Sequence, residues 1–315
     1  MGVKTPLRLE EANRLFEGQR FSALHATQDG IIDTTYIAET PRGRCILKRY
    51  EEAMPEAVAA EELLLQHLRR RGLNVPEPLG GSGRWRLFGC LEGSSPKRVT
   101  LRHIGAVAVF LGRMHRETRG LCTVPAAFER SDVKRALSRI RRHSPAAWHR
   151  FAPLAESGLF SQCDGVIHGD LFPDNCVFEG GRIGVFDFIE AGFGSFLLDA
   201  AVVAANWALR GKDAGRVRHF VQVYNRHAPR KIAFAELCDA METASRLYAM
   251  KRYVHTQIEG DGAPPYRQQL EKLRQIKQLK ARERLFCPER GKLQCHSGQR
   301  SFRGLASEAV KKGIL

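Results

Sequence analysis

The pattern of hydrophobic and polar positions changes from a strand-like to a helix-like period near residue 92. Before it, residues 34–50 alternate as two strands around a turn at 41–43, and residues 85–93 read as a further strand. Residues 54–72 have a helical period, with a proline at the start and a glycine at the end. Helical stretches follow at 101–117, 132–143, 195–209, 216–227 and 234–255. We therefore expect an α+β protein with a sheet-rich lobe over 1–92, a mainly helical lobe over 93–285 and a basic tail over 286–315.

Composition and charge agree with two lobes. The chain has 315 residues, of which 43% are hydrophobic, and a formal net charge of +16. From residue 267 to residue 315, thirteen Lys or Arg stand against four Asp or Glu, so over half of the excess lies there. Residues 267–284 have the pattern of a basic amphipathic helix, which we expect to be solvated and followed by disorder rather than bound to nucleic acid. Eight scattered cysteines without a C-x-x-C pair, and no secretory signal or spanning apolar run, favour a cytoplasmic protein without a membrane partner.

The segment 166–191, VIHGDLFPDNCVFEGGRIGVFDFIEA, contains the strongest chemical signal. His168, Asp170 and Asn175 have the H-x-D-x-x-x-x-N spacing of a kinase catalytic loop, in which the Asp faces the nucleophilic hydroxyl and the Asn binds metal. Two short apolar runs separated by Gly180 and Gly181 predict a hairpin that returns Asp187 to the side of Asn175. We therefore predict that Asp170 is catalytic and that Asn175 and Asp187 hold Mg²⁺.

A phosphate-binding lysine and its acidic partner are expected upstream. Lys48 ends an apolar strand, at the position from which a kinase lysine reaches the α- and β-phosphates of ATP. Glu61 lies on the leucine-bearing face of the following helix and can turn toward Lys48, with Glu62 as the alternative. The segment with Gly30 and Thr34 precedes the strand and is a weaker candidate for the loop over the phosphates, since it has a single glycine.

These motifs resemble a known family of small-molecule kinases. HGDLFPDN at 168–175, FDFIEA at 186–191, LDAAVVAANW at 198–207, LGRMH at 111–115 and GLNVPEP at 72–78 are similar to the family that includes aminoglycoside phosphotransferases, choline kinases and homoserine kinases. Within it, the type II homoserine kinases are the most similar. The resemblance implies a two-lobed protein-kinase-like fold of the aminoglycoside phosphotransferase type, with ATP and Mg²⁺ as cofactors.

The resemblance also assigns supporting residues. The strand at 85–93 would lead into the segment that binds adenine through the backbone of Cys90, Leu91 and Glu92. Asp199 would brace the backbone of the catalytic loop around His168, although capping its own helix is an alternative role. His115 is expected to be a core or capping histidine.

The acceptor is the open part of the prediction. The resemblance favours L-homoserine, a zwitterionic amino acid, whose pocket needs a cation and acidic or amide groups. Glu190, Asn206, Trp207, Arg246 and Arg252 are the candidates. Departures from the family pattern at Ile189-Glu190, Ala205 and Asp33 leave choline, ethanolamine and aminoglycosides as alternative acceptors. A catalytically silent nucleotide- or RNA-binding module on the same fold is a further alternative, and the sequence does not predict the oligomeric state.

Overall fold

The computed structural model describes residues 3–27, 32–121, 127–210, 213–260 and 265–286. Met1–Leu279 form one compact unit, and Lys280–Leu315 form a second unit; the division of the first unit into two lobes stays a prediction. Among the described helices, none combines the length and apolar character that a bilayer crossing requires.

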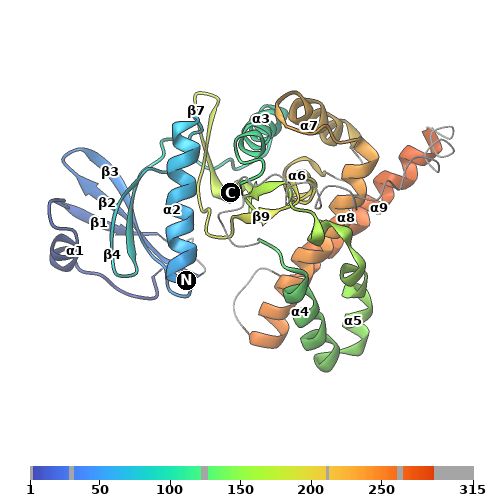
Figure 1. Ribbon diagram of the computed structural model, residues 1–315, viewed down its shortest axis with the longest axis horizontal. Coiled ribbons are helices and arrows are strands. Elements are labelled where there is room, and N and C mark those ends of the chain that lie inside the picture. Colours follow the sequence, from blue (N-terminus) through green and yellow to red (C-terminus); the bar gives the residue numbers. More distant parts are fainter. Residues whose placement is uncertain (1–2, 28–31, 122–126, 211–212, 261–264, 287–315) are drawn as a thin grey trace, which may run out of the picture. The chain divides into compact units, whose positions relative to one another are not determined.

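A five-stranded antiparallel sheet forms the first part of the chain (Figure 1). Its strand order is β1-β2-β3-β5-β4, and each neighbouring pair is antiparallel. The strands are β1 (Ala23–Ala26), β2 (Thr34–Thr40), β3 (Gly43–Arg49), β4 (Pro78–Ser82) and β5 (Trp85–Gly89). Helix α1 (Leu9–Leu15) packs its buried Ala12 into the same apolar cluster as the inward residues of β2, β3 and β5. The predicted strand pair around residues 41–43 is confirmed.

Helix α2 (Pro55–Arg70) lies beside this sheet and has a buried stripe that includes Leu64, Leu65 and Leu68 (Figure 1). Proline at the first helical position is preorganised for a helix start, and the chain leaves the last turn through Gly72 at φ 73°. The leucine stripe belongs to the large core cluster shared with the later helices. Helix α2 therefore connects the sheet to the rest of the fold.

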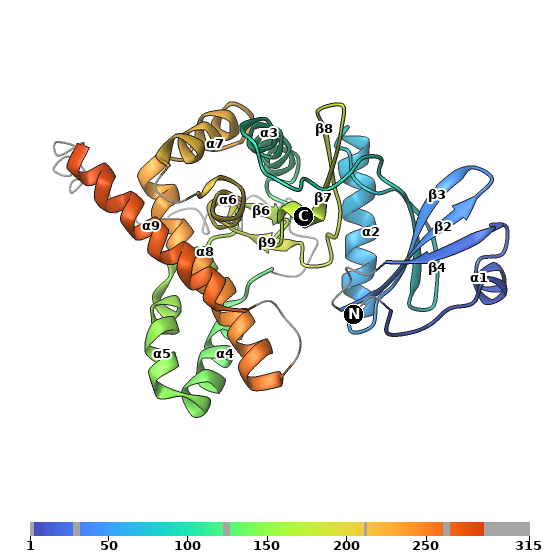
Figure 2. The same cartoon turned by 180° about the vertical axis from the view of Figure 1, so that it is seen from behind.

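The remaining described chain is mainly helical (Figure 2). Its helices are α3 (Leu101–Glu117), α4 (Arg130–His143), α5 (Pro145–Phe151), α6 (Phe196–Val203), α7 (Ala214–His227), α8 (Phe234–Tyr253) and α9 (Arg267–Phe286). Short 3₁₀ turns occur at Ala152–Glu156, Gly158–Ser161 and Pro173–Asn175, and π turns at Ala204–Ala208 and Val254–Glu259. The α+β architecture expected from the sequence is confirmed.

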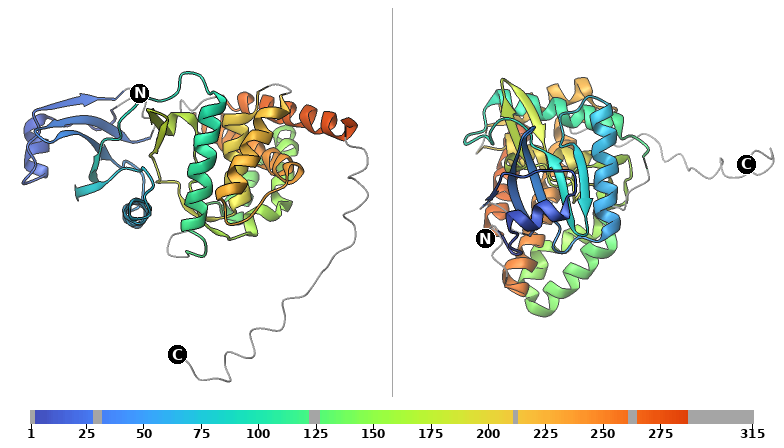
Figure 3. Two further views of the ribbon diagram at one scale, coloured as in Figure 1. Left: turned by 90° about the horizontal axis from the view of Figure 1, so that it is seen from above. Right: turned by 90° about the vertical axis from the view of Figure 1, so that its left-hand side faces the viewer.

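Two small sheets lie among these helices. Strand β6 (Gly165–Ile167) pairs with β9 (Gly192–Gly194), and β7 (Cys176–Glu179) pairs with β8 (Arg182–Val185). The β7–β8 turn consists of Gly180 and Gly181, both with positive φ, as the predicted two-residue glycine turn requires. Both views in Figure 3 show the blue N-terminal strands and the yellow-green segment that contains β7 and β8.

The amphipathic helix α9 differs from the sequence expectation. It was expected to be solvated, but Ile276 and Leu279 are fully buried in the main core cluster and Lys272 is only partly exposed. The apolar stripe of this basic helix therefore packs against the main core cluster, and Lys272 is partly buried with it. Residues 287–315 of the predicted tail lie outside the described residues.

Candidate active site

The segment between β6 and β7 forms a loop whose backbone is held from behind. Asp199, near the start of α6, accepts hydrogen bonds from the backbone N–H groups of His168, at 2.9 Å, and Gly169, at 3.1 Å. The Nε2 atom of His115 lies 3.0 Å from Asp199 Oδ2, while its Nδ1 lies 2.7 Å from the Tyr224 hydroxyl. Burial disfavours the Asp199 carboxylate, yet the hydrogen bond from His115 lowers the pKa of Asp199, so it stays ionised. Because His115 is fully buried and stacks on Phe196, it is a core histidine, as expected.

The same loop is supported from its other sides. The Trp207 indole N–H donates to the Leu171 carbonyl at 2.9 Å, and the Tyr248 hydroxyl donates to the Gly169 carbonyl. Trp207 is 2% exposed, so it lies beneath the loop, and its role in a substrate pocket stays a prediction. A methyl group at Gly169, whose φ is 78°, would lie 2.9 Å from the Glu190 carbonyl oxygen. The loop conformation therefore depends on glycine at this position.

His168 is a neutral, buried part of this loop. Its Nδ1 accepts a hydrogen bond from the Asp170 N–H at 3.2 Å, and its Nε2 lies 3.3 Å from the Phe186 carbonyl oxygen. Since Nδ1 acts as an acceptor, the proton resides on Nε2. Burial lowers the pKa of His168, which agrees with a neutral ring. The imidazole joins the catalytic loop to the strand that leads to Asp187.

Asp170 and Asn175 are in direct contact. The Asn175 amide nitrogen donates to the Asp170 carbonyl oxygen at 2.8 Å and to Asp170 Oδ2 at 3.1 Å. Burial raises the pKa of Asp170 to about 7, with Glu190 and Asp187 acting in the same direction and Lys251 opposing them. A carboxylate with this pKa is suited to accept a proton near neutral pH.

Asp187 follows the β7–β8 hairpin, and its placement depends on an unusual backbone conformation. The Phe186 N–H donates to the Asn175 carbonyl at 3.1 Å, which brings the residue before Asp187 alongside Asn175. Asp187 has φ 64°, and it is the one non-glycine residue with positive φ in the described part of the chain. Such a conformation is uncommon outside glycine and is concentrated at functional sites.

Lys48 reaches Asp187 from β3. Its Nζ lies 2.8 Å from Asp187 Oδ1 and 3.2 Å from Asp33 Oδ2. Burial opposes the charged form of Lys48, but the carboxylates of Asp187, Glu61 and Asp33 together raise its pKa. The same attraction lowers the pKa of Asp187 despite its burial. Both groups are therefore charged at neutral pH.

Glu61 faces this pair, whereas Glu62 faces away from it. Glu61 is 5% exposed, accepts the Phe188 N–H at 2.9 Å and accepts the Tyr50 hydroxyl. Burial raises the pKa of Glu61 to about 7, although the charge of Lys48 opposes this. Glu62 pairs instead with Arg86 at 3.1 Å. The structure therefore brings Glu61, not its neighbour, toward Lys48 and the backbone after Asp187.

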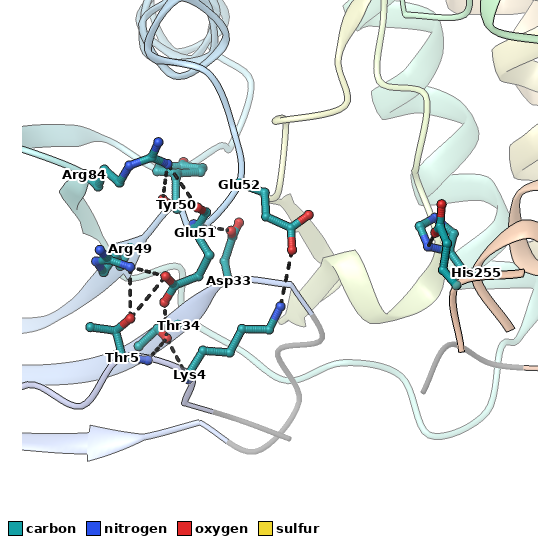
Figure 4. A network of polar contacts seen from close by, with 11 residues as sticks. Lys4, Thr5, Asp33, Thr34, Arg49, Tyr50, Glu51, Glu52, Arg84 and His255 are labelled. Carbon is teal, nitrogen blue, oxygen red and sulfur yellow. Dashed lines mark hydrogen bonds and ion pairs between the residues drawn. The ribbon is translucent and has the colours of Figure 1, made fainter. Parts of the chain in front are cut away.

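Of the two residues predicted to lie over the phosphates of the nucleotide, the structure describes only Thr34. Thr34 is fully buried, and its hydroxyl accepts the backbone N–H groups of Lys4 and Thr5 and donates to Glu51 (Figure 4). Because these partners occupy the Thr34 hydroxyl, its contact with phosphates stays a prediction. Gly30 lies outside the described residues.

The predicted adenine-binding segment follows β5. The Cys90 N–H donates to the Arg44 carbonyl at 3.4 Å, and Glu92 pairs with Arg44 at 3.1 Å. Leu91 and Glu92 line a cavity of about 300 Å³ on the side of α2 and the β7–β8 turn. The binding of adenine by the backbone of Cys90, Leu91 and Glu92 stays a prediction.

Some of the predicted acceptor residues are linked by their contacts to Asp170 or its surroundings, and Arg246, among the described residues, is not. Glu190 pairs with Lys251 at 3.0 Å; burial lowers the pKa of Arg252, and the charges of Asp170 and Asp174 oppose this shift. Asn206 belongs to the π turn after α6, and its side chain contacts Lys272 of α9. Burial lowers the pKa of Arg246, against the charge of Glu242 on the same helix, and the Arg246 Nε has no hydrogen-bond partner among the described residues. Arg246 is thus not brought to the catalytic loop by any contact in this part of the chain.

Sequence reasoning missed several residues of the site. These are Asp33 as a partner of Lys48, Tyr50, Lys251 and Lys272. Asp33 was visible as a departure from the family pattern. The others carry no local motif, since their positions depend on how distant helices pack.

The site contains suitable donors for a divalent metal. The amide nitrogen of Asn175 is turned toward Asp170, which leaves its carbonyl oxygen for a ligand. Asp187 remains a carboxylate, and oxygen donors are the ligands that hard divalent cations prefer. These residues fit a metal that binds ATP. Among the described residues, His, Cys, Asp and Glu alone form no group of three suited to a metal.

Comparisons with known proteins agree with this geometry. Residues 24–236 match the family described as "APH: Phosphotransferase enzyme family". The homoserine kinase of Methylobacillus glycogenes is 29% identical over 269 residues, covering 75% of this chain and 81% of that protein. The choline kinase LicA from Streptococcus pneumoniae has a similar fold, with a TM-score of 0.63 and 14% identity over 86% of this chain and 97% of its own. The amicoumacin kinase hAmiN, in complex with AMP-PNP, Ca²⁺ and Ami, has a TM-score of 0.60 and 17% identity over 87% of this chain and 92% of its own.

Proposed function

The chain belongs to the phosphotransferase enzyme family, and from this premise we propose that it transfers the γ-phosphoryl group of ATP to the side-chain hydroxyl of L-homoserine. It is an ATP-dependent kinase for a small metabolite and uses a divalent metal, as its family implies. Homoserine as the acceptor, Mg²⁺ as the metal and a place in threonine biosynthesis are the finer parts of the proposal. They are supported by the likeness to homoserine kinases over three quarters of the chain.

The observation that carries the proposal is the group formed by Asp170, Asn175, Asp187 and Lys48. Asp170, with a pKa raised to about 7 by burial, accepts the proton of the acceptor hydroxyl as its oxygen bonds to the γ-phosphorus and ADP departs. Asn175 and Asp187 supply the oxygen donors that hold Mg²⁺. When bound, Mg²⁺ neutralises charge on the β- and γ-phosphates.

The other residues position these groups. Lys48 binds the α- and β-phosphates, and Glu61 favours its charged form while holding the Phe188 amide. Asp199 and His168 fix the backbone of the catalytic loop through buried hydrogen bonds. Cys90, Leu91 and Glu92 supply backbone groups for adenine, and Thr34 is the described residue of the segment assigned to the phosphates.

The charges around Asp170 favour an acceptor that carries both signs. Lys251 and Arg252 lie near Asp170 together with Glu190 and Asp174. A polycationic aminoglycoside would instead call for a surrounding rich in carboxylates alone.

The aromatic side chains that could form a cage around choline make other contacts. Trp207, Tyr224, Tyr248 and Tyr253 are all buried. The polar groups of the first three are bound to Leu171, His115 and Gly169, respectively. An aromatic cage built from these residues is therefore disfavoured, which supports the amino-acid acceptor.

The test is ADP release with Mg²⁺ and ATP in the presence of L-homoserine, L-serine, choline, ethanolamine or an aminoglycoside. We expect turnover with L-homoserine above the others. Asp170→Asn should lower kcat by about 10²- to 10⁴-fold while leaving binding of a fluorescent ATP analogue intact. Preference for another acceptor would reject homoserine, and an Asp170→Asn enzyme of normal activity would remove Asp170 from the mechanism.

A further inference from the structure

Two cations on the acceptor side of the catalytic loop lack the acidic partners that the other inward cations have. Lys48, Lys251 and Arg86 each have a carboxylate oxygen at 2.8, 3.0 and 3.1 Å, respectively. Arg252 and Lys272 form no ion pair with any described residue; Arg252 donates to the neutral Gln268 at 3.3 Å, and Lys272 contacts the Asn206 amide oxygen. Both are only partly exposed.

These two side chains also affect each other. The positive charge of Arg252 acts to lower the pKa of Lys272. The negative charge of Asp174, which follows Asp170 in the same loop, acts to raise the pKa of both side chains. Burial and the nearby charge of Arg252 together lower the pKa of Lys272 to about 8, with the charge of Asp174 opposing them. Neighbouring, partly buried cations without a paired acid are unfavourable by themselves, and an anion that lies between them relieves this.

The position of the pair identifies which anion it meets. Lys272 Nζ lies 5.9 Å from the ring centroid of Phe172, and the Phe172 N–H donates to the Asp170 carbonyl at 2.8 Å. The charge of Asp170 acts to raise the pKa of Arg252, whereas the cation bound to Asp187 is Lys48. The pair thus lies beside the group that faces the acceptor hydroxyl, and the phosphate-binding lysine is a separate cation.

We propose that Lys272 and Arg252, with Asn206 orienting Lys272, form the site that binds the carboxylate of an amino-acid acceptor. This inference rests on the proposed function and adds to it a residue that sets acceptor class. Lys272 belongs to α9, which lies outside the family-matched residues 24–236. The carboxylate site therefore comes from a part of the chain that the shared phosphotransfer machinery does not include. Glu190, which pairs with Lys251 at 3.0 Å, is the candidate for the ammonium group and would have to exchange this partner.

The test compares L-homoserine with 3-amino-1-propanol, which has the same hydroxyl and amine but no carboxylate. Lys272→Met should lower kcat/KM for L-homoserine by about 10- to 100-fold, mainly through KM, because it removes a binding contact remote from the reacting atoms. The value for 3-amino-1-propanol should change little, so the discrimination between the two acceptors narrows by the same factor. Lys277→Met, an exposed lysine of the same helix, is the matched control and should behave as wild type.

The outcomes separate the inference from the proposed function. If wild type phosphorylates L-homoserine but Lys272→Met keeps the discrimination of Lys277→Met, the carboxylate site is overturned and the proposed function stands. If wild type releases ADP with neither compound, the proposed function falls, and calorimetry decides the site alone. In that case, carboxylate-dependent binding of L-homoserine that Lys272→Met weakens would retain the site, and equal or absent binding of the two compounds would reject it. Circular dichroism and melting curves establish that each variant is folded.

Discussion

Glu61 accepts a hydrogen bond from the backbone N–H of Phe188 at 2.9 Å, so helix α2 holds the residue that directly follows Asp187. The same carboxyl group accepts a hydrogen bond from the Tyr50 hydroxyl, and its negative charge acts to raise the pKa of Lys48. One buried side chain thus connects the lysine of β3 to the segment after the β7–β8 hairpin, although Glu61 and Phe188 are 127 positions apart in the sequence.

Replacing Glu61 with Gln tests this connection. The amide keeps a hydrogen-bond acceptor for Phe188 but removes the negative charge near Lys48, so we expect activity to fall more than stability. The expected loss in kcat/KM for ATP is about 10- to 100-fold, and the free energy of unfolding should change by no more than about 1.5 kcal/mol. Glu62→Gln, which affects only the partly exposed pair with Arg86, is the control and should stay near wild type. Indistinguishable kinetics in the two variants would contradict the role of Glu61.

Replacing Asp199 with Ala tests the support of the catalytic loop. It leaves the buried N–H groups of His168 and Gly169 and the ring of His115 without their acceptor, so the expected loss in unfolding free energy is about 3–5 kcal/mol. Urea denaturation followed by circular dichroism measures this loss. Asp213→Ala removes an exposed helix-capping carboxylate at α7 and should cost only about 1 kcal/mol. Equal denaturation midpoints for the two variants would show that Asp199 does not stabilise the loop.

The binding of an acceptor carboxylate should depend on pH through Lys272. Burial lowers the pKa of Lys272 to about 8, so the side chain is cationic below this pH and loses its charge above it. The charged groups around it are Arg252 of α8, which lowers this pKa, and Asp174 of the catalytic loop, which raises it. We therefore expect KM for L-homoserine to be constant below about pH 7 and to be about tenfold higher at pH 9.

Lys272→Arg is the control for this pH dependence, because a guanidinium group keeps its charge over the whole range. Its KM should be nearly independent of pH between 6.5 and 9, as measured by initial rates at saturating ATP. A wild-type profile that overlays the profile of Lys272→Arg would contradict the assignment of this titration to Lys272.

Much of the fold and the central site could be predicted because their signals are local. The glycine turn at 180–181, the strand pair around 41–43 and the proline at the start of α2 specify backbone geometry within a few residues. The spacing of Asp170 and Asn175 places both on one loop, and the hairpin determines where Asp187 returns.

Other features depend on contacts between distant segments, which a single sequence does not display. Helix α9 has a basic composition that is typical of a solvated helix, and only its packing shows that Lys272 is directed inward. Trp207 was an aromatic candidate for the acceptor pocket, but its indole N–H is bound to a carbonyl of the catalytic loop. The π turn at Ala204–Ala208, which positions Asn206, likewise has no recognisable sequence signal.

The left-handed backbone of Asp187 has a consequence for how this enzyme can diverge. Its φ of 64° is a conformation that glycine adopts most easily, whereas the metal-binding role proposed for it demands a carboxylate. Folding and chemistry therefore select different amino acids at one position. A lineage that lost phosphotransfer would be released from this conflict, and glycine at residue 187 would be an early mark of a descendant that had retained the architecture and abandoned the reaction.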